Sequence, residues 1–139
     1  MVTEQLSIVG LKTSVKRLLE EGLTVKIFDA VPKNYQEPFL QIAPVTVAPV
    51  KNKTMHRSVF NVPIRVFLPP SENKSSVAHD TLTSDVLEVL SKEVEVPHPY
   101  ECWNQRITGM SDPVPFDDGF TQTVITLELD VLSGFKMKL

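Results

Sequence analysis

The sequence predicts a single α+β domain in which two helices cover one face of a mostly antiparallel sheet. Two windows without proline carry apolar residues at helical spacing, and the other segments carry the branched or alternating apolar residues typical of strands. Eleven prolines against five glycines confine helices to those two windows. The expected order is α-β-β-β-α-β-β, a two-layer sandwich that occupies residues 1–139.

Each expected helix has one apolar face. The first covers about residues 4–21, and Gly22 follows its last periodic residue as a candidate left-handed C-cap. Its apolar stripe consists of Ile8, Leu11, Val15, Leu18 and Leu19. The second covers about residues 77–92, with a stripe of Ala78, Leu82, Val86, Val89 and Leu90. Because each stripe covers one face only, both helices are expected to pack on the sheet.

Five strands are expected, and short loops between consecutive strands favour antiparallel pairing. They are Leu23–Phe28, Phe39–Val47, Thr54–Leu68, Tyr100–Met110 and Phe120–Val131. Pro44 indicates that the second is an edge strand or carries a bulge. The second and third strands form a long hairpin at about residues 39–68, in which Phe60, Val62 and Ile64 alternate with polar residues.

The composition limits the classes of function. A formal net charge of −3 gives no general reason to bind nucleic acid. No apolar run approaches the ~20 residues that span a bilayer, and residues 1–12 lack the basic and apolar regions of a secretion signal. Cys102 is the only cysteine, so an intramolecular disulfide is excluded and a reducing cytoplasm is compatible with the chain.

No constellation of residues points to catalysis. His56, His79, His98 and Cys102 are the candidate metal ligands, and their spacing does not converge on one site. Cys102 is expected to be a small buried hydrophobic residue rather than a nucleophile. The GxSxG, HExxH and glycine-rich phosphate-loop motifs are absent. The sequence therefore predicts neither an enzyme nor a cofactor.

The hairpin tip is a candidate assembly interface because it carries a basic cluster of Lys51, Lys53 and Arg57, beside His56. Such a cluster fits contact with an acidic partner or a phosphate. It also fits a solvated turn that keeps an exposed edge from aggregating.

An acidic loop at residues 111–119 carries the other candidate interface residues, Asp112, Asp117 and Asp118. Asp117, Asp118 and Gly119 fit either an acid pair that binds a cation or, more simply, a turn before the last strand. In a ring of identical subunits, this loop could meet the basic tip of a neighbour.

A helix leads into a strand that ends in Ile-Phe-Asp-Ala-Val-Pro, and after a polar gap Pro-Phe-Leu-Gln-Ile opens the next strand. A long strand, a helix with a leucine-rich stripe and a final strand follow. The segments are Leu11–Leu19, Val25–Pro32, Pro38–Ile42, Phe60–Leu68, Leu82–Leu90 and Gln122–Val131. This pattern resembles the small tail-completion or tail-terminator proteins of long-tailed bacteriophages over nearly the whole chain.

The resemblance implies a non-enzymatic virion protein without a cofactor. It implies a ring, typically of six copies, that caps the tail tube, stops its polymerisation and docks on the head connector. The implied partners are further copies of the chain, the tail tube protein and the head–tail connector protein, while DNA passes through the lumen without specific binding. The implied location is the head-proximal end of the tail, after assembly in the host cytoplasm and with no membrane contact.

Two alternatives remain open. One is a head–tail connector adaptor, which belongs to the same assembly one layer above. The other comes from a different class, a small α+β ligand-binding protein or enzyme that uses the sheet face. An enzyme would show a deep pocket with convergent polar groups.

Overall fold

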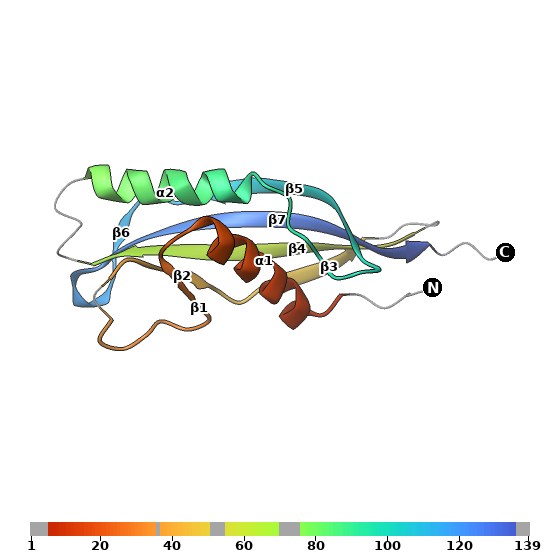
Figure 1. Cartoon of the computed structure of the whole chain (residues 1–139), viewed down its shortest axis with the longest axis horizontal. Helices are drawn as coiled ribbons and strands as arrows, with labels where there is room; N and C mark the ends of the chain where they lie inside the picture. The colour runs from red at the N-terminus through yellow and green to blue at the C-terminus, as the bar shows by residue number, and fades with distance from the viewer. Residues whose placement is uncertain (1–5, 36, 51–54, 70–75, 136–139) are drawn as a thin grey trace.

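The computed structural model describes residues 6–35, 37–50, 55–69 and 76–135 as two helices packed on one face of a curved sheet (Figure 1). In chain order the elements are α1 (Ile8–Gly22), β1 (Lys26–Phe28), β2 (Phe39–Ile42), β3 (Thr46–Val50), β4 (Met55–Leu68), α2 (Ser76–Leu90), β5 (Glu101–Met110), β6 (Val114–Pro115), a 3-10 turn η1 (Asp117–Gly119) and β7 (Thr121–Phe135). The predicted α+β class and order are confirmed. Two strands, β2 and β3, replace the second expected strand, and the short β6 lies in the acidic loop.

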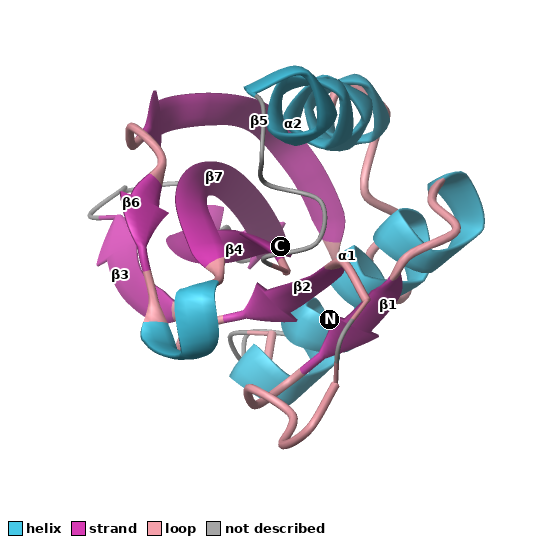
Figure 2. Cartoon of the chain, turned by 90° about the vertical axis from the view of Figure 1, so that its left-hand side faces the viewer, coloured by secondary structure: helices cyan, strands magenta, loops and turns pink. Residues whose placement is uncertain are grey.

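The sheet has the strand order β1-β2-β4-β7-β5, with β3 also paired to β4 and β6 to β7. Every pair is antiparallel except β1 and β2, which run parallel with Lys26 opposite Phe39. The sequence favoured antiparallel pairing there. The ten residues 29–38 instead return the chain to the same end of the sheet, as a parallel connection requires. Figure 2, viewed along the sheet, shows the strands curling around β7.

The division between β2 and β3 lies opposite Pro63 in β4. The Ala43 N–H donates to the Pro63 carbonyl at 2.9 Å. In an antiparallel strand the nitrogen and the carbonyl of a residue point to the same side, so the missing N–H of Pro63 also faces this neighbour. The interruption at residues 43–45 therefore falls where β4 has no donor to offer.

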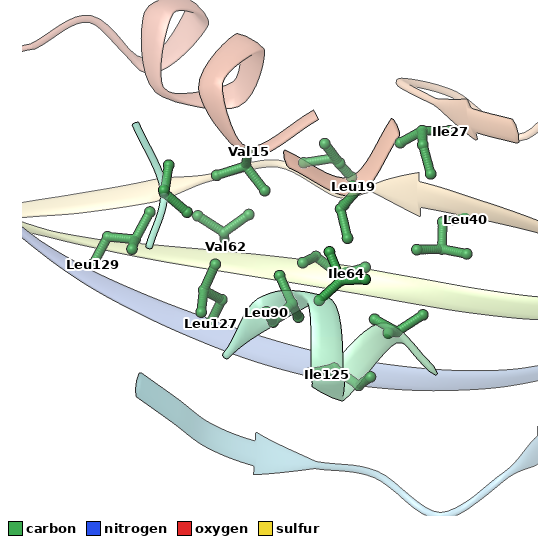
Figure 3. Packing of buried hydrophobic residues seen from close by; sticks show 14 of the residues in the cluster. Val15, Leu19, Ile27, Leu40, Val62, Ile64, Leu90, Ile125, Leu127 and Leu129 are labelled. Carbon is green, nitrogen blue, oxygen red and sulfur yellow. The ribbon is translucent and has the colours of Figure 1, made fainter. Parts of the chain in front are cut away.

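The hydrophobic core fills the space between the helices and the sheet (Figure 3). Phe60, Val62 and Ile64 of β4 are fully buried, as the alternation predicted. They meet the fully buried row Ile125, Leu127 and Leu129 of β7. The helices cover both rows with Leu11, Val15, Leu19, Val86, Val89 and Leu90. Full burial of one such side chain contributes roughly 1.5–3 kcal/mol, so this layer is the main source of stability.

The ends of α1 differ from the sequence prediction. The helix begins at Ile8, and the Ser7 hydroxyl caps it by accepting the Gly10 N–H at 2.9 Å. At the other end Gly22 is still helical, and Leu23 leaves the helix in an extended conformation with φ −130°. The left-handed C-cap expected at Gly22 is therefore wrong.

Candidate assembly surfaces

The sheet face opposite the helices carries two ion pairs between neighbouring strands. Arg57 of β4 donates two hydrogen bonds to the Asp130 carboxylate of β7, at 2.9 and 2.8 Å. Arg106 of β5 donates to Glu128 of β7 at 2.9 Å. These cross-strand pairs place opposite charges side by side on this face.

The structure places Arg57, one of the predicted tip residues, within its own subunit's contacts. Its side chain is only 23% exposed, its fork is bidentate on Asp130, and its guanidinium lies 5.6 Å from the centre of the Trp103 ring. Lys51 and Lys53 lie outside the described residues. Contact between this basic cluster and a partner stays a prediction. The charge of Arg57 is already paired with Asp130.

The acidic loop folds as a turn. Asp117 begins η1, the Phe120 N–H donates to the Asp117 carbonyl at 3.3 Å, and Gly119 has a left-handed φ of 80°. Asp118 belongs to the same turn, and Asp112 is exposed in the loop before β6. Among the described residues, no group of three or more histidine, cysteine, aspartate or glutamate side chains is placed to hold a metal ion.

The described residues that flank the two charged loops lie at opposite ends of the sheet. Leu68 at one end of β4 pairs with Thr121, just after the acidic turn. At the other end Arg57 pairs with Val50 in the hairpin. The 14 residues of β4 extend roughly 45 Å at ~3.3 Å per residue. Figure 1 shows β6 at one end of the sheet, and β3 and the C-terminal end of β7 at the other. Arg57 and the acidic turn of one subunit are therefore far apart.

An aromatic cluster, absent from the sequence prediction, lies on the outer sheet face beside the acidic turn. Phe39 of β2 stacks on Phe67 of β4, with ring centres 4.6 Å apart. Phe28, Tyr35, Phe116 and Phe120 surround this pair. A hollow of about 420 Å³ opens beside the cluster, bordered by Lys33 and Asp117. Only the register between β2 and β4 brings Phe39 onto Phe67, so no local pattern could have indicated the cluster.

Arg65 lies against two rings of this aromatic cluster. Its guanidinium lies 4.9 Å from the Phe67 ring centre and 5.2 Å from that of Phe116. It also donates hydrogen bonds to Gln41 at 2.7 Å and to Gln122. Burial lowers the pKa of Arg65, although an arginine keeps its charge at any ordinary pH. This arginine therefore supports the packing of the cluster.

β5 is the last strand of the sheet at the edge away from β1. It pairs with β7 on one side, and its other side pairs with no described strand. The register of β5 shifts at Trp103 and at Thr108, so its paired residues fall into three short runs, 101–102, 104–107 and 109–110. Trp103 and Met110 are each 54% exposed and Ile107 is 37% exposed. A hollow of about 460 Å³ separates this edge from the end of α2. Exposed apolar residues along a sheet edge are typical of a protein–protein contact.

Gln105 joins this edge strand to the end of α2. Its side-chain amide donates to the carbonyls of Leu90 at 2.8 Å and Lys92 at 2.6 Å, and its oxygen accepts the Val94 N–H at 2.9 Å. One side chain thus closes the C-terminal end of the helix, where carbonyls lack partners within the helix. These hydrogen bonds join the two elements that border the hollow, β5 and the end of α2.

Cys102 lacks the electrostatic setting of a nucleophile. Burial raises the pKa of its thiol to about 11, and the charges of Glu93 and Asp130 add to the rise. A reactive cysteine needs a lowered pKa, because the thiolate is the attacking species.

Within the described part of the chain, no helix combines the length and apolar character needed to cross a bilayer.

Comparisons with known proteins place this fold. A family model described as "Putative tail termination protein" matches residues 2–139. A chain in the structure titled "Virion of native gene transfer agent (GTA) particle" has a similar fold, with a TM-score of 0.66 at 13% sequence identity. The match covers 92% of this chain and 99% of that chain. A search of curated proteins gave no match.

Proposed function

The chain belongs to the family of phage tail termination proteins, and from this we propose that its copies form a ring, of six subunits, that ends the tail tube. The family match over residues 2–139 carries the proposal, since it covers the sheet, both helices and the segments that hold the basic cluster and the acidic loop. The protein is thus a structural component of a virion tail. The ring, its position and its partners are the steps proposed here.

In this proposal the ring sits at the head-proximal end of the tail, after assembly in the host cytoplasm. One face of the ring binds the last layer of tail tube protein and stops polymerisation, and the other face binds the head connector. DNA passes through the lumen without specific contacts, which a chain of net charge −3 supports because it offers few excess cations to phosphates.

The proposal includes no catalytic step and no cofactor. The hollow beside the aromatic cluster is bordered mainly by aromatic and aliphatic side chains rather than by convergent polar groups. The one cysteine has a raised pKa. These features support an assembly protein over the alternative of a small ligand-binding protein or enzyme.

The test combines mass measurement in solution with electron microscopy of tail tubes. We expect a concentration-dependent hexamer of the 15.6 kDa chain and a cap at one end of each tube. We also expect the tubes to stop growing once the protein is added. Binding to isolated connectors but not to tube ends would identify an adaptor instead. A monomer that ignores tubes at every concentration contradicts the proposal.

A further inference from the structure

The hollow beside the aromatic cluster, here called the aromatic hollow, is suited to apolar side chains. Among the described residues that border it, six are apolar or aromatic: Val31, Pro32, Tyr35, Phe39, Phe116 and Phe120. Phe39 and Phe120 are buried, whereas Val31 is 37% exposed. A volume of about 420 Å³ is within the range of pockets that hold a ligand, so it is large enough to take side chains of a partner.

Charge contributes little to what the aromatic hollow can bind. The other described residues on its border are Lys33, Asn34 and Asp117, so one cation stands against one anion. A charged occupant would therefore meet no net attraction there. Apolar side chains gain from entering, because they leave water for the surface of the rings.

The sequence that follows β7 has the chemistry of such an occupant. Residues 135–139 read Phe-Lys-Met-Lys-Leu, and residues 136–139 lie outside the described residues. Apolar and basic residues alternate, so an extended backbone would carry Met137 and Leu139 on one side and both lysines on the other. Methionine adds favourable contacts between its sulfur and aromatic rings.

The aromatic hollow of the same copy is out of reach of this segment. Phe120, on the border of the hollow, comes directly before β7, and Phe135 ends that strand. The 15 residues of β7 extend roughly 50 Å at ~3.3 Å per residue. Four residues extend at most about 14 Å. Residues 136–139 can therefore enter this hollow only in another copy.

We propose that residues 136–139 of one copy dock in the aromatic hollow of a second copy, with Met137 and Leu139 against its rings. The segment and the hollow belong to different ends of the sheet, so the contact is heterologous and each copy can bind one neighbour at each end. A heterologous contact forms a ring when its rotation closes, so this inference rests on the proposed function. It adds the segment and the hollow that join neighbouring subunits.

The direct test measures binding of a labelled peptide with the sequence of residues 134–139, Gly-Phe-Lys-Met-Lys-Leu, by fluorescence polarisation. The full-length protein carries Met137→Asp and Leu139→Asp, so that its own segment does not compete. Adding Val31→Asp, which places a carboxylate on the border of the hollow, should weaken binding at least ten-fold. Binding should persist at ~1 M salt, because salt screens charges and not apolar contacts. Val9→Asp is the matched control, because Val9 is 74% exposed on α1, away from the border of the hollow, and binding should stay unchanged.

Assembly provides the second measurement. A chain with Met137→Asp and Leu139→Asp keeps only the hollow, and a chain with Val31→Asp keeps only the segment, so each alone should associate weakly. An equimolar mixture should form a 1:1 dimer of two 15.6 kDa chains that does not grow further, which native mass spectrometry detects.

A peptide that does not bind, or that binds the Val31→Asp and Val9→Asp proteins equally, overturns the inference while the ring proposal stands. If Val31→Asp stops the capping of tail tubes and the variant of Met137 and Leu139 caps normally, the hollow binds another virion protein and the inference is likewise overturned. A wild type that stays monomeric with and without tail tubes overturns both.

Discussion

A β-carbon on Gly22 of α1 would lie 2.6 Å from one methyl carbon of Val89 on α2 and 2.9 Å from the other. Real β-carbons do not approach neighbours so closely, so the two helices pack at a distance that requires glycine. Gly22 is helical, and thus it is needed for space rather than for a left-handed conformation. This contact fixes the end of α1 against α2 above the core.

Gly22→Ala is therefore expected to destabilise the fold. Overpacking a tight contact costs about 1–3 kcal/mol, whereas alanine in place of glycine in a helix would otherwise stabilise by about 0.5–1 kcal/mol. The sign of the change in unfolding free energy, measured by urea denaturation, decides which effect dominates. Adding Val89→Ala should make the double variant less unstable than the sum of the two single variants.

Gly109→Ala is the control for this prediction, because a β-carbon there would meet no atom within 4 Å. Its effect should stay within about 0.5 kcal/mol. A stabilised Gly22→Ala variant would show that α1 can move away from Val89 at no cost.

Asp130→Ala should lower the unfolding free energy by about 1–3 kcal/mol, because it leaves the guanidinium of Arg57 without its charged acceptor. The pair is well shielded, with the two side chains 23% and 13% exposed. Arg106→Ala is the matched comparison on the same face, since Arg106 is 62% exposed and its pair with Glu128 is worth at most about 1 kcal/mol. Equal costs for the two variants would contradict the distinction.

The thiol of Cys102 should react slowly in the folded protein. Burial is the main cause that raises its pKa to about 11, so the thiol stays protonated at pH 8. An unfolded thiol has a pKa of about 8.5. As pH rises from about 8.5 towards 11, the unfolded state releases this proton first, so the thiol's contribution to stability falls across that window. Alkylation by iodoacetamide, followed against pH with and without urea, measures both values.

Glu93→Gln should lower the pKa of Cys102 by removing a nearby negative charge. Glu95→Gln, two residues further along and exposed, should leave the thiol pKa unchanged. A native thiol that is half-ionised near pH 8.5 would mean that the side chain is open to water.

Sequence patterns predicted the elements that depend on neighbouring residues. The apolar alternation of β4 and the stripe of α1 are local, and burial of Phe60, Val62, Leu11 and Val15 follows them. The split between β2 and β3 could be predicted only in part. Pro44 indicated an irregular strand, but the split itself lies opposite Pro63, which belongs to the neighbouring strand β4.

Features that depend on distant partners could not be predicted. The carbonyls that Gln105 binds lie 15 and 13 residues before it, and nothing beside it in the sequence marks that role. The parallel pairing of β1 depends on the path of the chain between the strands. Among the candidate interface residues, Arg57 lies along the outer sheet face because it pairs there with Asp130, which is 73 residues away in the sequence.

The predicted contact between the two charged loops can be tested by charge reversal. Lys51→Glu with Lys53→Glu, or Asp112→Lys with Asp117→Lys, should each weaken assembly if the basic tip of one copy meets the acidic loop of another. Both reversals in one chain should restore it, since attraction returns with the signs exchanged. Arg57 is left unchanged because Asp130 already holds it. Capping of tail tubes, scored by electron microscopy at low and at ~1 M salt, measures the effect, and the difference should vanish at high salt, where screening acts over about 3 Å. If the double reversal caps no better than either single reversal, the loops do not pair.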